Sequence, residues 1–240
     1  MEKHRAAVVA LAFVAAMMIG AVSPAHAQTG PATAIDVALE PDAVMMARAQ
    51  AANADLLKDF PKGFALDATH NPHITLLQRY ARTADLNKVY AAVAKVLARE
   101  NVTRCKLKAT RYYYASAGPV GVAGIVVDTT PDLLRLQKEL IDAVAPFTVE
   151  TGDVTAFYTT PEEPTVIPAI VTYVATYVPQ ASGDNFNGHV TTGIGTIPFL
   201  KALVAAPFDA FTFTPAGVSI WQLGDYGTAR KELRALDQRP

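Results

Sequence analysis

The alternation of hydrophobic and polar positions predicts a chain of short helices and strands. Apolar residues that recur every three or four positions mark one face of a helix, whereas strict alternation or a short apolar run between turn residues marks a strand. We expect helices over residues 42–58, 85–99, 131–145, 160–178, 198–205 and 228–236. We expect strands over residues 33–39, 73–80, 104–115, 120–128, 148–158, 208–214 and 218–223. The β-branched residues in 160–178 weaken the helical pattern of that segment.

The order of these elements repeats along the chain. Strand, helix, strand, helix, strand, strand, helix runs to about residue 145, and a similar order with an altered beginning runs to the C-terminus. Helices bury their apolar face on a sheet, and strands joined by short turns pair antiparallel. We therefore expect an α+β fold that is bilobal and pseudo-symmetric. It would have two mainly antiparallel sheets, helices on the outer faces and a central groove, where ligands usually bind.

The first 27 residues have the pattern of a secretory signal peptide. A basic front precedes an uninterrupted apolar run from residue 6 to about residue 22, and Ala25-His26-Ala27 supplies small residues for a cleavage site. The run is at the short end for a membrane span, so an uncleaved anchor is the weaker interpretation. We expect cleavage between Ala27 and Gln28, a periplasmic or secreted protein, and no stable membrane anchor after cleavage.

Charge and cysteine content narrow the class of protein. The 240-residue chain carries 21 Lys and Arg against 22 Asp and Glu, a formal net charge of −1. This balance argues against broad electrostatic binding of duplex nucleic acid but permits a small anion held by local groups. Cys105 is the single cysteine, so no intrachain disulfide can form, and we expect it to be a small buried side chain.

The segment after the leader, residues 28–240, is long enough to bury a proper core and is expected to be a single bilobal domain. Its lobes would cover approximately residues 33–145 and 146–240, and strands could be exchanged between them. We expect a monomer.

Two short motifs, His73-Ile74-Thr75 and His189-Val190-Thr191, occupy matching places in the repeated order of elements. Side chains two residues apart on a strand point to the same face, so each histidine shares a face with its threonine. A single histidine of this kind on a strand is more often a core or surface residue than a catalytic one. Two such motifs at matching places predict a groove lined by two imidazoles and two hydroxyls.

These side chains suit acid–base chemistry on a phosphodiester. With a pKa near 6.5, histidine is found in both protonation states near neutral pH, and a threonine hydroxyl can donate to a phosphate oxygen without adding charge. One imidazole could accept a proton from an attacking water while the other protonates the departing oxygen. This chemistry requires no metal or other cofactor, and the motifs leave open which histidine is the acid.

The paired motifs resemble the H-x-T motifs of the two-histidine phosphoesterase superfamily, which includes 2′,5′ RNA ligase-like proteins and cyclic nucleotide phosphodiesterases. Residues 121–140 are similar to the family's strand followed by a Leu-x-x-Leu-Gln helix, and residues 218–227 to its late strand and glycine-containing turn. The resemblance therefore covers most of residues 34–236. The motifs lie farther apart than in compact members, which indicates an insertion around residues 150–187.

The resemblance implies a bilobal fold with the two motifs facing each other across a groove. It also implies that His73 and His189 are the acid–base pair and that Thr75 and Thr191 bind the substrate phosphate. The implied activity is that of a metal-independent phosphodiesterase. It would hydrolyse a cyclic (2′,3′-type) or related phosphodiester of a small nucleotide or an RNA end.

Aromatic residues on two strands are further candidates for the groove. Tyr112 and Tyr114 continue a basic face of the strand over 104–115, which is either a groove wall or a solvated edge. Trp221 shares a face of a later strand with Ser219 and either lines the other wall or lies in the core.

Two rival hypotheses stay open. A non-catalytic binding module could keep the same groove for a nucleotide or another phosphorylated ligand. A metal-dependent hydrolase could instead use His70 and His73 with Asp67 or Asp184, although Pro72 constrains the local chain and zinc usually needs three or four ligands.

Overall fold

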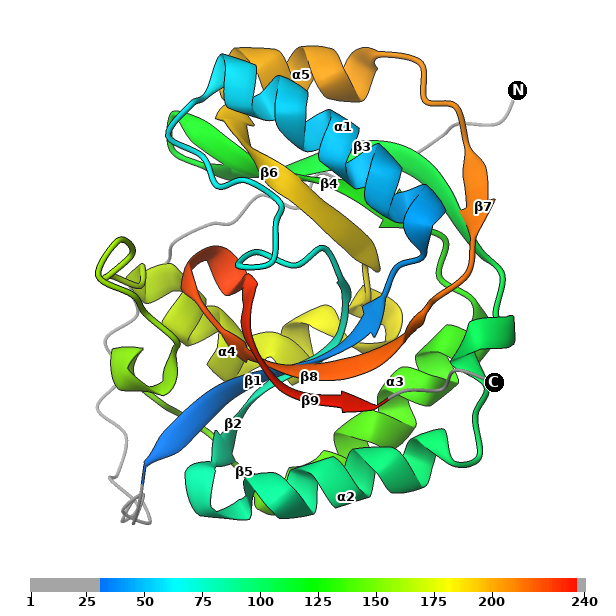
Figure 1. The fold of residues 1–240 in the computed structure, drawn as a ribbon, viewed down its shortest axis with the longest axis vertical. Helices are drawn as coiled ribbons and strands as arrows, with labels where there is room; N and C mark the ends of the chain where they lie inside the picture. Colours follow the sequence, from blue (N-terminus) through cyan, green and yellow to red (C-terminus); the bar gives the residue numbers. More distant parts are fainter. Residues whose placement is uncertain (1–30, 237–240) are drawn as a thin grey trace, which may run out of the picture.

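The computed structural model describes residues 31–236, which form one curved nine-stranded antiparallel sheet with five α-helices packed on it (Figure 1). The predicted signal peptide lies outside the described residues. Along its main path the sheet has the order β7-β3-β4-β6-β2-β1-β8-β9, and β5 pairs with β2. The expected α+β class is confirmed, and the two expected sheets are joined into one.

The sheet has two halves that meet at a single residue pair. One half contains β7 (Phe211–Phe213), β3 (Leu107–Ala117), β4 (Val120–Val127) and β6 (His189–Thr196). The other contains β2 (Ile74–Arg82), β1 (Ala32–Glu40), β8 (Gly217–Leu223), β9 (Ala229–Leu236) and the short β5 (Thr148–Val149). The joint between the halves is the pairing of Ile74 with Val190. Each half contains strands from both the N-terminal and the C-terminal part of the chain.

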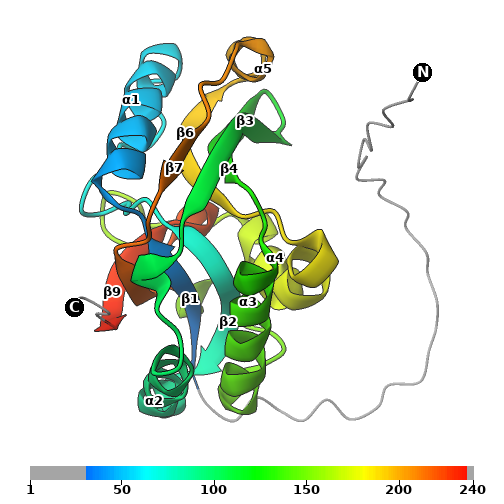
Figure 2. The same cartoon turned by 90° about the vertical axis from the view of Figure 1, so that its right-hand side faces the viewer.

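The helices cover different parts of this sheet, and Figure 2 shows α1 and α5 at one end of the molecule with α2 and α3 at the other. The bounds are α1 (Ala43–Asp59), α2 (Leu86–Leu97), α3 (Pro131–Val144), α4 (Pro168–Ala181) and α5 (Ile197–Ala205). Helix α1 packs on β6, whereas α3 and α4 both pack on β2. No helix among residues 31–236 is long and apolar enough to cross a membrane.

Both faces of the β1–β2 region are covered. Ile35 and Val37 of β1 belong to the main hydrophobic core together with Val89 of α2. The alternate residue Ala34 packs in a second cluster with Ile170 and Val174 of α4. Because side chains alternate along a strand, α4 lies over the same face of β1 as Asp36.

Helix starts follow the capping signals in the sequence. Asp42 caps α1, since its Oδ1 accepts hydrogen bonds from the backbone N–H groups of Val44 and Met45, both at 3.0 Å. Thr130 caps α3, with Leu133 N–H donating to its hydroxyl at 3.2 Å, and Pro131 stands at the first helical position.

Three sequence expectations are wrong. Residues 228–236 form strand β9 instead of a helix, and most of the strand expected over 148–158 is irregular after β5. Cys105 is exposed instead of buried, because β3 begins only at Leu107. In β9, Ala229, Leu233 and Leu236 have helical spacing, but the β8–β9 ladder contains two irregularities in register that disrupt the alternation. Pairing with β8 overrides the helical propensity of this segment.

Candidate active site

The joint between β2 and β6 brings both His-x-Thr motifs to one place. The strands are antiparallel, so pairing of Ile74 with Val190 places His73 near Thr191 and Thr75 near His189. Ile74 and Val190 point into the hydrophobic core, where both are fully buried. The two histidines and two threonines therefore share the other face, and all four line one cavity of about 270 Å³.

Several elements complete the wall of this cavity. They are β2, β3, helix α4, the segment that precedes β6 and the turn between β8 and β9. The further lining residues are Gln78, Tyr113, Ala115, Ile170, Tyr173, Tyr177, Ala181, Asn185, Phe186, Asn187, Tyr226 and Gly227. Among the described residues, no lysine or arginine lines it.

His73 is held at both ring nitrogens. Its Nδ1 lies 2.7 Å from the carbonyl oxygen of Asn71, and a carbonyl only accepts, so Nδ1 carries a proton. Its Nε2 lies 3.3 Å from Oδ2 of Asp36. Burial lowers the pKa of His73, but the hydrogen bond and negative charge of Asp36 outweigh it and raise the pKa above the ordinary value. The imidazolium form of His73 is favoured.

His189 has the same backbone anchor, but among the described residues no carboxylate forms an ion pair with its ring as Asp36 does with His73. Its Nδ1 donates to the carbonyl oxygen of Asn187 at 2.7 Å, so the neutral ring presents an unprotonated Nε2. Burial lowers the pKa of His189, and the positive charge of His73 lowers it further. The two imidazoles are thus pushed apart in pKa, as expected for a base and an acid that work together.

Gly124 lets the His189 ring pack closely against β3 and β4. Tyr113 of β3 lies edge-on to His189, with ring centroids 4.7 Å apart. A Cβ on Gly124 would lie 2.6 Å from Cε1 of Tyr113 and 3.3 Å from Cδ2 of His189. A side chain at this position would therefore displace one of the two rings.

Asp36 contacts both His73 and Thr75 of the first motif, and the sequence did not single it out. It is fully buried, and its Oδ2 accepts hydrogen bonds from the Thr75 hydroxyl at 2.7 Å and from Nε2 of Gln78 at 3.0 Å. The Thr75 hydroxyl proton is therefore directed to Asp36. Phosphate binding by Thr75 and Thr191 stays a prediction. The available signal was a carboxylate in the middle of the largely apolar strand β1, flanked by Ile35 and Val37.

The two tyrosines predicted to line the groove lie on the face of β3 that points away from the cavity. A shift in register between Ala109 and Arg111 reverses the alternation along β3, so Tyr113 faces the cavity. Tyr112 packs edge-on against Phe208, with centroids 4.9 Å apart, and Tyr114 packs against the cluster around Leu56. The groove-lining prediction for Tyr112 and Tyr114 is thus corrected to Tyr113.

Trp221 also lies away from the cavity wall. It pairs with Asp36 across β1 and β8 and so points to the same face, but only 6% of its surface is exposed. It packs with Ala38 and Ala229, where the chain enters β9. Trp221 is a core residue in this fold.

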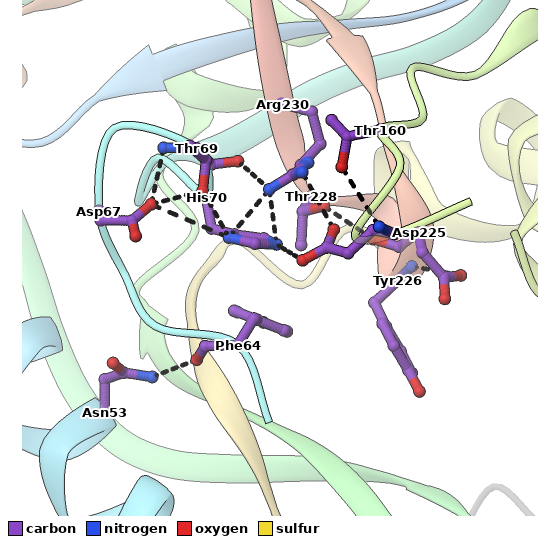
Figure 3. A network of polar contacts seen from close by, with 11 residues as sticks. Asn53, Phe64, Asp67, Thr69, His70, Thr160, Asp225, Tyr226, Thr228 and Arg230 are labelled. Atoms are coloured by element: carbon purple, nitrogen blue, oxygen red, sulfur yellow. Dashed lines mark hydrogen bonds and ion pairs between the residues drawn. The ribbon is translucent and has the colours of Figure 1, made fainter. Parts of the chain in front are cut away.

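His70 belongs to a separate buried network beside the site (Figure 3). Arg230 of β9 lies 2.9 Å from Nε2 of His70, donates to the Thr69 carbonyl at 2.7 Å and pairs with Glu163 at 3.1 Å. The Phe64 ring stacks on His70 at 4.9 Å. This network fastens the segment before β2 to β9.

The network around His70 does not have the composition of the metal site considered from the sequence. His70 lies against the guanidinium of Arg230 as well as near the carboxylates of Asp67 and Glu163, at 3.9 and 3.3 Å. Within residues 31–236, no group of three or more His, Cys, Asp or Glu side chains is arranged to hold a metal ion.

Similarity to known proteins is found at the level of structure. No protein-family model matches the chain, and no curated protein sequence matches it. Among solved structures, TT0787 of Thermus thermophilus is similar with a TM-score of 0.53 and 17% identity, over 86% of this chain and 98% of that one. This likeness shows a shared fold.

Two other solved structures are less similar. E. coli LigT complexed with 3′-AMP has a TM-score of 0.42 and 13% identity, over 87% of this chain and 100% of that one. Usb1 of Kluyveromyces marxianus has a TM-score of 0.37 and 9% identity, over 85% and 98%. At 17% identity or less, these likenesses concern the fold alone.

Proposed function

We propose that this chain is a metal-independent phosphodiesterase that hydrolyses a cyclic (2′,3′-type) or related nucleotide or RNA phosphodiester. The observation that carries the proposal is the pair of imidazoles on one cavity, anchored alike through Nδ1 and shifted in pKa in opposite directions. The shared fold and the paired motifs support the same reaction class.

In this proposal His189 is the base and His73 is the acid. Unprotonated Nε2 of His189 accepts a proton from water, and the water oxygen forms a bond to phosphorus in line with the departing ester oxygen. The ester bond breaks, and the Nε2 proton of His73, otherwise directed at Asp36, passes to that oxygen. The Thr191 hydroxyl donates to a nonbridging oxygen, and the two histidines regain their protonation states by exchange with solvent.

The test is hydrolysis of a nucleoside 2′,3′-cyclic phosphate in the presence of a chelator. His73→Ala and His189→Ala should each lower kcat by at least about 10²-fold, the usual contribution of a general acid or base. Lys138→Ala is a matched control, because Lys138 is exposed on α3, pairs with Asp142 and does not line the cavity. Full activity in either histidine variant would refute the proposal. Tight binding of the nucleotide without turnover would favour the non-catalytic module.

We also propose that the protein is exported through its leader and works outside the cytoplasm as a monomer. The sequence of residues 1–27 is the support for export. Mass spectrometry of the protein from the periplasm or medium should find an N-terminus at Gln28. An intact leader on protein that stays with the cytoplasm would contradict it.

A further inference from the structure

Helix α4 and the segment that follows it close one side of the cavity. Tyr173 and Tyr177 of α4 and Phe186 of the following segment all line it. The helix is firmly packed: Tyr80 of β2 donates to the Val171 carbonyl at 2.9 Å, and Val174 is fully buried. The wall is therefore a fixed part of the fold, and it belongs to the stretch expected to be an insertion.

The end of this wall is also tied to the sheet. The buried side chain of Gln137 on α3 donates to the Leu76 carbonyl of β2 at 3.1 Å and accepts from Gly183 N–H at 3.1 Å. Gly183 has a φ of +57°, a conformation that favours glycine. One amide thus fixes the segment after α4 to the strand that follows His73.

The α4 wall and strand β3 of the opposite half of the sheet line the same cavity. Burial raises the pKa of Tyr113 on β3, and the neighbouring Tyr173 on α4 raises it further. Burial also raises the pKa of Tyr173, to about 12. Tyr113 lies edge-on to His189, and both phenols line the cavity and stay uncharged in the neutral range. The cavity that they line has a volume of about 270 Å³.

The charged groups that line the cavity suit a ligand with a single negative charge. With no lysine or arginine in the described lining, the imidazolium of His73 is the cation that meets a ligand, and it already faces buried Asp36. A phosphodiester carries a single negative charge, whereas a phosphomonoester at neutral pH or a chain of phosphates carries more. The additional charges would be desolvated there without a basic partner.

Tyr226 supplies a preformed aromatic surface beside this charge. Its φ of +56° is unusual for a bulky residue, and it is held by the Asp225 carboxylate, which accepts from Tyr226 N–H at 2.9 Å and from Ile167 N–H at 3.0 Å. Strained backbone of this kind persists when the surrounding structure enforces it and clusters at ligand sites. The ring lines the cavity and suits a flat apolar group such as a nucleobase.

We propose that the site accepts a phosphodiester of about mononucleotide size that carries one negative charge, and that it disfavours both oligoribonucleotide ends and phosphomonoesters. This inference rests on the proposed function, whose substrates it narrows. The α4 wall limits size, the lack of basic side chains limits charge, and Tyr226 receives the base.

The size limit is tested by comparing kcat/KM for a nucleoside 2′,3′-cyclic phosphate and for a short oligoribonucleotide that ends in the same cyclic phosphate. The mononucleotide should be preferred by at least about tenfold. Truncation by Tyr173→Ala should reduce that preference severalfold, whereas Tyr158→Ala, outside the lining, should leave it unchanged. Equal or better turnover of the oligonucleotide would overturn the size limit and leave the proposed function standing. Turnover of neither substrate would refute the proposed function itself.

The preference for a single negative charge is tested with two inhibitors of similar size. Adenosine 3′-(methyl phosphate), a monoanion, should inhibit at least about tenfold more strongly than adenosine 3′-phosphate, which is largely a dianion at pH 7.5. The difference should shrink at pH 5.5, where the monoester carries one charge. Equal inhibition at pH 7.5 would overturn the charge limit, whatever the result for oligonucleotides.

Discussion

At the scale of single residues, the two histidines differ in what lies beside Nε2. Both donate through Nδ1 to a carbonyl two residues earlier, so the backbone sets the same tautomer twice. Only His73 has a carboxylate, Asp36, at its Nε2. Asp36 and burial together give two similarly anchored imidazoles opposite shifts in pKa, as the proposed acid and base require.

Replacement of Asp36 by Asn removes this charge while keeping a similar shape. The pKa of His73 should fall, because the hydrogen bond and charge that raise it are lost and burial then dominates. The alkaline limb of the pH–rate profile should move to lower pH, and kcat at pH 7 should fall by about tenfold. NMR titration of the His73 imidazole gives its pKa directly. An unchanged His73 pKa would contradict the assignment of Asp36.

At the scale of elements, the site depends on where strands depart from regular geometry. Helices with a strong apolar stripe, such as α2 and α3, could be predicted from the sequence because their spacing is local. The irregularity in β3 that turns Tyr113 toward His189 could not, because it depends on how β3 and β4 pair. The helix expected over residues 228–236 is strand β9 for a related reason, because pairing with β8 determines its conformation.

A glycine in β4 permits the close approach of strand β3 to the second motif. Gly124→Ala should reduce the free energy of unfolding by about 1–3 kcal/mol, because its Cβ would lie 2.6 Å from the Tyr113 ring and 3.0 Å from the Val190 carbonyl. Denaturant unfolding measures the loss. Gly217→Ala is the matched control, since a Cβ there meets nothing within 4 Å. Similar stability of the two variants would contradict the packing described for Gly124.

A substitution at Tyr226, in the turn between β8 and β9, distinguishes backbone strain from a role in ligand binding. Tyr226→Gly should keep or raise the melting temperature, because glycine adopts a φ of +56° without penalty. It should also raise KM for a nucleotide substrate severalfold, because the aromatic surface is lost. Thermal unfolding and steady-state kinetics on the same sample give both quantities. A destabilised variant with unchanged KM would show that the ring serves packing alone.

At the scale of the whole molecule, the site lies where two halves of one sheet touch. The repeated order of elements correctly predicted that both motifs face a common space, because each repeat places its His-x-Thr strand at a matching position. It did not predict the single-pair joint at Ile74 and Val190. It also gave no account of the shape of the cavity, which depends on α4 and the β8–β9 turn packing from elsewhere in the chain.

The pH dependence of kcat/KM on a nucleoside 2′,3′-cyclic phosphate tests the assigned roles most directly. The profile should be bell-shaped, with an acidic limb below pH 6.5 from His189 and an alkaline limb above it from His73, as their shifted pKa values require. His189→Gln should remove the acidic limb from the residual activity, and His73→Gln should remove the alkaline one. A profile with both limbs intact in either variant, or with the limbs exchanged between them, would contradict the account.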